Sequence, residues 1–460
     1  MKKVQNALFI IFCLFIAQFC TLTTKFWEYE ENAPVRSIKK PGDFTGSGFG
    51  TLMIPVYVRT SGTQTNPSFE GDYLAIAGEK PSEIGLFRFS QNEKIIDGDI
   101  FAIFPKVLPD DFFSSGFAQS LTGAPLYDDG IKIHTGCIAA GIPEKGGIEI
   151  FDIEGNSQFF EIHSISKAGN HIASVIHSKS HPVDGFVITQ DSDAVFLQLP
   201  SLNEQVLEVN PPIPSPAHIT GVTSGNSASG NNPWIAVGSN GRFYIFLFDT
   251  LESSYKLGYC IEDSEAGFGA GVFSGDADGD SNEDLIVSGG QDFSEEYEKV
   301  IIISGEKFAG NSIPDPIQCY SINSNEVNPY IIAQFECHDF EQRGVLCGSE
   351  PLFGKEISVG NLDSETAPEI IISSPGATVD GIEGAGAAFI FKTNSPEPIG
   401  VLRASSPSHN QHFASSVTVL SIAGRDEVFI GIPQEDTVLL YYCSNIGDDS
   451  SPPGDRFCRP

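Results

Sequence analysis

Residues 267–290 read GFGAGVFSGDADGDSNEDLIVSGG, and this stretch contains the unit that is repeated along the chain. A short apolar strand begins at Phe268, a turn rich in Asp and Gly follows, and a second apolar run starts at Leu285. Short apolar runs bounded by turn residues are typical of buried β-strands. The stretch therefore predicts two strands joined by a tight acidic turn.

The same kind of beginning recurs at intervals of 47 to 85 residues. The seven repeats start near Phe49, Phe117, Ile172, Ile219, Phe268, Phe353 and Phe413. Each start is followed by two further apolar runs, such as IIISSPGA and AAFIFK in the sixth repeat, and most repeats have a weaker fourth run. Seven tandem units of four short strands predict an all-β fold, a seven-bladed β-propeller, in which neighbouring blades stack and the ring must close.

Closure of the ring requires a strand from the beginning of the chain. The seventh repeat has only three strands before a polar C-terminal tail, residues 446–460, whereas residues 22–30, LTTKFWEYE, have no role in the first repeat. We expect a strand around Phe26–Tyr29 to complete the last blade, so that the propeller spans residues 24–445. The alternative is that this segment is a loose terminus.

A long insertion, residues 306–352, separates the fifth and sixth repeats and contains Cys319, Cys337 and Cys347. Long insertions in propellers form surface loops, which often carry function. We therefore expect this segment to be a surface loop.

The first 20 residues predict export. Lys2 and Lys3 precede a 14-residue apolar run, residues 7–20, which is long enough for the core of a signal peptide and short for a membrane span. We predict a signal peptide at residues 1–20 and a secreted, extracellular chain without a membrane span. An uncleaved membrane anchor is the alternative.

Seven cysteines follow this segment. In an oxidising compartment the pairs that close the shortest loops, Cys337–Cys347 and Cys443–Cys458, are expected to form disulfides. An odd number leaves at least one thiol unpaired or intermolecular. Cys137 lies in an apolar run, and we expect it to be a buried, inert thiol.

The charge of the chain excludes one class of partner. There are 26 Lys and Arg residues against 60 Asp and Glu residues, a formal net charge of −34. Such a field repels nucleic acids and anionic membrane surfaces, which require clustered basic residues. The hydrophobic fraction of 40% is ample for a packed core, so the acidity does not indicate disorder. High net charge also favours a soluble monomer.

The acidic turn of the fifth repeat has the composition of a Ca²⁺ site. Asp276, Asp278 and Asp280 alternate along the turn, and Asp284 follows at position nine. Ca²⁺ takes six to eight oxygen ligands, and the carbonyl of Asn282 at position seven can supply one more. Carboxylates this close together repel each other unless a cation lies between them. A solvated acidic turn is the alternative.

The order of Phe-Gly, aspartate turn and strand ending in small residues resembles the FG-GAP repeat, which builds the seven-bladed head of integrin α subunits. FGAGV followed by GDADGDSNEDLIVSGG is the most similar part, and FGKEISVGNLDSETAPEIIISSPGA, from Phe353, is similar in layout. The resemblance covers roughly residues 26–443. It implies Ca²⁺ between the first two strands of a blade, on the side opposite the ligand loops.

The same resemblance points to a weaker site in the sixth repeat. The matching positions there are Asn361, Asp363, Glu365, Ala367 (through its carbonyl) and Glu369. Glu replaces Asp twice and the turn glycine is missing, so a weakened site and no site are both open.

For function, the resemblance implies a non-catalytic, adhesion-type module that uses Ca²⁺ and binds a protein or cell-surface ligand. One alternative is a carbohydrate-binding lectin. Another is a propeller accessory to a secreted hydrolase, because a phospholipase that cleaves lipid anchors carries a propeller of this kind. That enzyme class needs a separate catalytic domain before the propeller, and only about 25 residues lie between the signal and Phe49.

Overall fold

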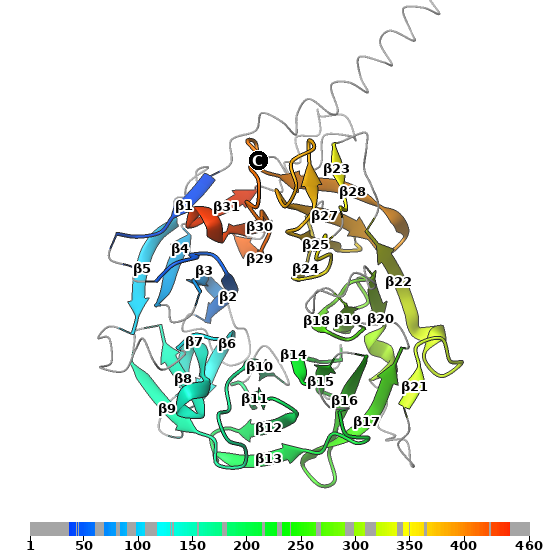
Figure 1. Cartoon of the computed structure of the whole chain (residues 1–460). Helices are drawn as coiled ribbons and strands as arrows, with labels where there is room; N and C mark the ends of the chain where they lie inside the picture. Colours follow the sequence, from blue (N-terminus) through cyan, green and yellow to red (C-terminus); the bar gives the residue numbers. More distant parts are fainter. Residues whose placement is uncertain are drawn as a thin grey trace, which may run out of the picture.

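The computed structural model describes residues 36–42, 44, 46–59, 69–79, 83–89, 98–105, 117–128, 130, 133–153, 156–176, 182–213, 217–227, 232–239, 241–263, 268–289, 299–308, 319–337, 344–348, 350–362, 366–422 and 425–441. Across these residues, seven antiparallel sheets of four strands each form the blades of a ring, and one of them gains a fifth strand (Figure 1). The predicted all-β, seven-bladed β-propeller is confirmed.

In every blade the first strand lies nearest the axis of the ring and the last lies outermost (Figure 1). Blades one to four consist of β2 (Leu52–Arg59), β3 (Phe69–Ala77), β4 (Ile84–Phe89) and β5 (Gly98–Phe104); β6 (Leu121–Asp128), β7 (Ile133–Ile142), β8 (Gly147–Asp152) and β9 (Ser157–Glu161); β10 (His171–Val175), β11 (Gly185–Gln190), β12 (Asp193–Gln198) and β13 (Asn203–Leu207); and β14 (Ile219–Gly225), β15 (Trp234–Ser239), β16 (Arg242–Asp249) and β17 (Ser254–Glu262). Blades five to seven consist of β18 (Gly271–Gly275), β19 (Asp284–Ser288), β20 (Lys299–Ile303) and β22 (Ile331–Glu336); β24 (Ile357–Gly360), β25 (Glu369–Ser374), β27 (Ala387–Lys392) and β28 (Ser395–Arg403); and β29 (Ser416–Ile422), β30 (Arg425–Ile432), β31 (Thr437–Tyr441) and β1 (Arg36–Lys39). The aromatic or Ile residue that starts each repeat lies at, or a few residues before, the first strand of its blade.

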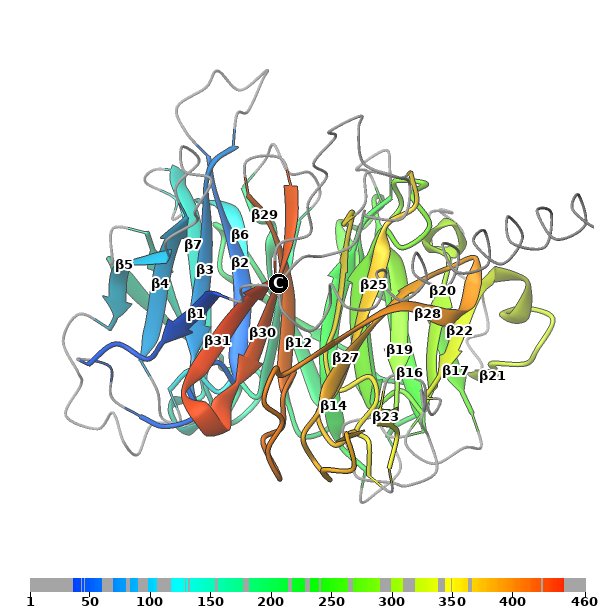
Figure 2. The same cartoon turned by 90° about the horizontal axis from the view of Figure 1, so that it is seen from above.

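Burial decreases from the middle of a blade to its rim. Every residue of β15, WIAVGS, and of β25, EIIISS, is buried, whereas most residues of the outer strand β9 are exposed. Seen edge-on, the strands run from one face of the ring to the other (Figure 2). Each inner strand lies between two neighbouring blades, which cover it on both sides (Figure 1). A continuous apolar run with no polar alternation is the sequence pattern of such a strand.

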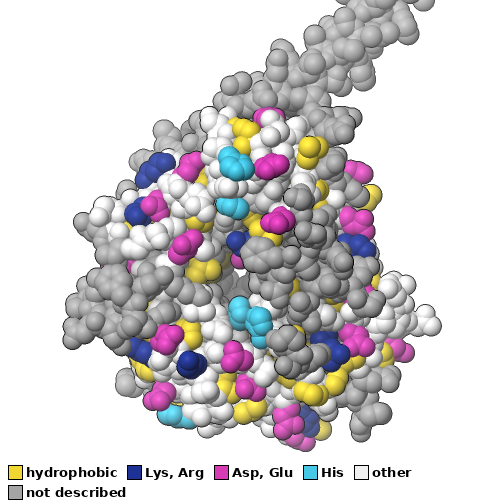
Figure 3. Space-filling model, viewed as in Figure 1, with side chains coloured by type: hydrophobic (Ala, Val, Ile, Leu, Met, Phe, Trp, Pro, Cys, Tyr) yellow, Lys and Arg dark blue, Asp and Glu magenta, His cyan; other side chains and the backbone are white. Residues whose placement is uncertain are grey.

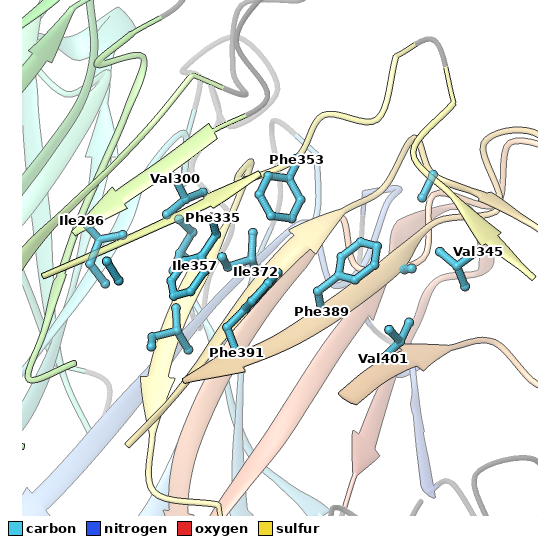
Figure 4. Close-up of a cluster of buried hydrophobic side chains, with 14 of the residues drawn as sticks. Ile286, Val300, Phe335, Val345, Phe353, Ile357, Ile372, Phe389, Phe391 and Val401 are labelled. Carbon is cyan, nitrogen blue, oxygen red and sulfur yellow. The ribbon is translucent and has the colours of Figure 1, made fainter. Parts of the chain in front are cut away.

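The core consists of apolar layers between neighbouring blades. Phe335 of blade five packs against Phe391 of blade six with 4.4 Å between ring centroids and the rings tilted by 32°, and next to them Phe353 meets the edge of Phe389 at 5.8 Å (Figure 4). Ile286 of blade five belongs to the same cluster. Because these layers couple each blade to the next, a change within one blade is transmitted to its neighbour.

The last blade is closed by the N-terminal part of the chain, as expected, but the closing strand is β1 and not the segment Phe26–Tyr29. β1 pairs antiparallel with β31, and in Figure 1 the two lie side by side in blue and red. Asp436, just before β31, accepts a hydrogen bond from the backbone nitrogen of Phe49 at 3.0 Å and forms an ion pair with Lys40 at 2.8 Å. The segment Phe26–Tyr29 lies outside the described residues.

The insertion of residues 306–352 is not simply a surface loop, which corrects the sequence-based expectation. Its centre forms β22, the outer strand of blade five, and β21 (Cys319–Ser321) pairs in parallel with β17 as a fifth strand of blade four. The insertion therefore contributes strands to two adjacent blades.

Two disulfides cross-link the insertion of residues 306–352. Cys337–Cys347 forms as predicted, and Cys260–Cys319, which the sequence did not indicate, joins β17 to β21. Cys137 is a buried free thiol, as predicted, and burial raises its pKa to about 12. Cys443 and Cys458 lie outside the described residues.

No helix in the described ranges is both long and apolar enough to cross a membrane.

Candidate metal centre

The acidic turn of blade five is held at both ends by paired strands. β18 and β19 run antiparallel, and their last rung joins Gly275 to Asp284. The turn therefore begins immediately after one strand at Asp276 and ends at the first residue of the next. This arrangement places Asp284 inside the blade, where it is fully buried.

Hydrogen bonds within the turn fix its shape. The carboxylate of Asp276 accepts from the backbone nitrogen of Gly279 at 2.8 Å and from that of Ser281 at 3.0 Å. Gly279 has a φ of +81°, which favours glycine. A Cβ at this position would lie 2.5 Å from the carbonyl oxygen of Thr366 in blade six. Glycine is therefore required both by the turn and by the neighbouring blade.

Three carboxylates converge inside this turn. One oxygen from each of Asp276, Asp278 and Asp284 lies within 4.8 Å of the other two. Asp284 is oriented by two backbone donors, Ala277 to Oδ2 and Gly305 to Oδ1, each at 2.8 Å. The cluster thus consists of hard oxygen donors, one of which is fixed inside the blade.

The electrostatics of the cluster favour a bound cation. Burial, reinforced by the charges of Asp278 and Asp280, raises the pKa of Asp284 to about 7 even though its two backbone donors act in the opposite direction. Burial also raises the pKa of Asp276 and of Asp278, and the charge of Asp280 adds to both shifts. Carboxylates whose ionised forms are disfavoured in this way are stabilised by a nearby positive charge. Ca²⁺ supplies such a charge and prefers oxygen ligands, so the residues present fit the ion.

Not every predicted ligand joins the cluster. Asp280 is exposed, and its carboxylate accepts hydrogen bonds from the backbone and side-chain nitrogens of Asn282 at 2.7 and 2.8 Å. Its charge nevertheless acts on all three carboxylates of the cluster, so its predicted role as a ligand stays a prediction. The ligand role predicted for the Asn282 carbonyl likewise stays a prediction.

The corresponding turn of blade six is only partly described. Asp363 and Glu365 lie outside the described residues, while Asn361, Ala367 and Glu369 lie within them. The backbone nitrogen of Asn361 donates to Asp426 of blade seven at 2.7 Å. Ala367 lies next to Thr366, the residue that packs against the blade-five turn.

Glu369 is buried at the start of β25, and one of its oxygens lies 3.1 Å from the Nζ atom of Lys392. Lys392 could not be recognised from the sequence pattern, because it lies 23 residues beyond Glu369 and only the pairing of β25 with β27 brings the two together. A Lys at the end of the third apolar run is the only signal that the sequence offered.

Comparison of the chain with protein-family models and with curated proteins finds no match.

Proposed function

We propose that this chain is a Ca²⁺-stabilised β-propeller that acts as a non-catalytic binding module of the integrin-head type, built from FG-GAP-like repeats. The observation that supports it is the convergence of Asp276, Asp278 and Asp284 within 4.8 Å between the first two strands of one blade. Ca²⁺ takes oxygen ligands in flexible geometry at 2.3–2.6 Å, and Asp side chains on a tight turn supply them.

The role of the ion is structural in this proposal. Bound Ca²⁺ neutralises the cluster and holds the turn of blade five against the backbone of Thr366 in blade six. An ion that binds only the folded turn stabilises the folded chain by mass action. The ring then serves as a rigid frame, and connections between strands supply specificity for the ligand.

The partner is a protein or cell-surface ligand. Acidic side chains, in magenta, are spread over the face in Figure 3 rather than gathered in one patch. Together with the net charge of −34, this distribution disfavours polyanionic ligands such as nucleic acids. The two disulfides support an oxidising location, in agreement with a secreted chain.

A capture experiment tests this function. The purified chain is immobilised and exposed to cell-surface proteins and to a glycan array, in 1 mM Ca²⁺ and in chelator, with Asp278→Asn as the matched variant. Asn at position 278 keeps the oxygen that accepts from the backbone nitrogen of Asp280 but removes the charge. We expect a surface protein to be retained in Ca²⁺ and to be lost in chelator and with the variant.

Retention of glycans alone would indicate a lectin instead. If a surface protein is retained equally well in chelator and by the Asp278→Asn variant, Ca²⁺ has no part in the binding function.

A further inference from the structure

Blades five and six place an acidic residue at the same point of their second strand. Asp284 and Glu369 are each the first residue of that strand, and each pairs with the last residue of the strand before. Each carboxylate is buried. Each also accepts a hydrogen bond from the second residue of its turn, Ala277 at 2.8 Å in blade five and Leu362 at 2.7 Å in blade six. The two side chains are therefore structurally equivalent.

The two blades differ in what faces the other carboxylate oxygen. In blade five, the third strand β20 ends at Ile303, opposite Leu285, and the next residue is the neutral Ser304; the oxygen accepts from the backbone nitrogen of Gly305. In blade six, the same point is occupied by Lys392, whose Nζ lies 3.1 Å from Glu369. The side chains of Lys392 and Glu369 are 10% and 1% exposed, so the pair lies inside the blade.

We propose that Lys392 occupies the cation position of the sixth-blade turn, so that this turn is a metal-independent counterpart of the candidate site in blade five. A buried carboxylate needs a positive partner, and the ammonium group supplies it from within the chain. A divalent ion at the same carboxylate would be repelled by the ammonium. Glu369, with Lys392 beside it, therefore does not fit the metal that the repeat pattern implies at this position.

The presence of Lys392 in place of a metal ion also has a consequence for blade five. The backbone of Thr366 in the sixth turn packs directly against Gly279 of the fifth. Because the Glu369–Lys392 pair does not depend on Ca²⁺, the described end of the sixth turn, residues 366–369, keeps its place without the ion and supports the fifth turn from outside. The pair can be tested by itself, and only its comparison with blade five rests on the proposed function.

A double-mutant cycle tests the pair. Thermal unfolding is measured in chelator for the wild type, Lys392→Met, Glu369→Gln and the double variant. Lys392→Met leaves a buried carboxylate without its partner, so we expect the melting temperature to fall by several degrees, and the double variant to recover most of that loss. Losses that simply add would overturn the proposal. Should Lys392→Met not fold, Lys392→Gln, which keeps a donor toward Glu369, takes its place in the cycle.

A metal titration tests the cation position. Ca²⁺ is added up to 5 mM to Asp278→Asn and to Asp278→Asn combined with Glu369→Gln, with the melting temperature as readout. We expect no Ca²⁺-dependent shift in either protein. A shift in Asp278→Asn that disappears with Glu369→Gln would place a metal ion in blade six and overturn the proposal. If the wild type does not respond to Ca²⁺ either, the blade-five proposal fails, while the double-mutant cycle still decides this one.

Discussion

The turns of blades five and six can be compared directly, because their flanking strands pair in the same register and bury an acidic residue at the same rung. In blade five, three carboxylates converge, and the residue that follows the third strand beside Asp284 is the neutral Ser304. In blade six, Glu369 faces Lys392. If blade five binds the ion and blade six does not, as proposed, the acidic turn alone does not define a metal site in such a blade. The residue at the end of the third strand then decides, because a Lys there neutralises the buried carboxylate and a neutral residue does not.

The largest expected effect comes from removing the buried carboxylate of blade five. Asp284→Ala leaves the backbone donors of Ala277 and Gly305 buried without acceptors, and each such donor costs about 1–3 kcal/mol. We expect the free energy of unfolding, measured by denaturant in chelator, to fall by about 2–6 kcal/mol. Asp280→Ala, at an exposed position of the same turn, is the control and should cost less than about 1 kcal/mol. Equal losses for the two variants would mean that Asp284 does not hold the turn.

A second prediction distinguishes two contributions to the stability loss of Gly279→Ala: the clash between the turns of blades five and six, and the strain of a positive φ. Gly279 and Gly381 have similar φ values, +81° and +79°, but only Gly279 lies against another segment, with Thr366 2.5 Å from a would-be Cβ. Ala strains the backbone at both positions, so we expect Gly381→Ala to cost about 1 kcal/mol and Gly279→Ala about 1–2 kcal/mol more. Denaturant unfolding measures both variants. Indistinguishable losses would show that the turns of blades five and six do not pack together.

The third prediction concerns removal of the ion. Ca²⁺ in tenfold excess over its dissociation constant stabilises the folded chain by about 1.4 kcal/mol. A chelator should therefore lower the melting temperature by a few degrees, and Asp278→Ala should lower it by a similar amount. Scanning calorimetry with and without chelator provides the measurement. After Asp278→Ala the chelator should have no further effect, and a remaining shift would locate another Ca²⁺ ion.

A further prediction is a pH dependence that arises in blade six away from both turns. Glu356 lies just before β24, and burial raises its pKa from the ordinary 4.5 to about 7, against a weaker opposite effect of Lys355. A raised carboxyl pKa means that the folded chain binds the proton more tightly than the unfolded chain. Stability is therefore lost as the pH rises from 4.5 through about 7. Glu356→Gln should unfold at a higher temperature than the wild type above pH 7, and the difference should shrink toward pH 4.5. A pH-independent difference would contradict this assignment.

The ring was predictable from the sequence because every blade repeats the same local pattern. A start residue such as Phe268 or Phe353, followed by short apolar runs, marks strands whose neighbours along the chain are also their neighbours in the sheet. The acidic residues of the blade-five turn could be found for the same reason, since they lie within nine positions of one another.

Features that depend on distant pairing were predicted less well. The closing strand lies at β1 rather than at Phe26–Tyr29, because a short strand at the rim carries little apolar signal of its own. β22 lies inside what looks like an insertion, and Cys260–Cys319 joins cysteines 59 residues apart. Lys392 could not be predicted either, because only the register of β25 and β27 brings it to Glu369.

The number of Ca²⁺ ions bound by the whole chain tests the account most directly. Isothermal titration calorimetry of the chelator-treated wild type should give one site with a dissociation constant in the range of about 0.1–1 mM, because extracellular Ca²⁺ modules commonly bind in that range. Asp278→Asn should give no binding. No heat from the wild type at millimolar Ca²⁺ would contradict the site in blade five, and two sites of which one disappears with Glu369→Gln would contradict the distinction between the two blades.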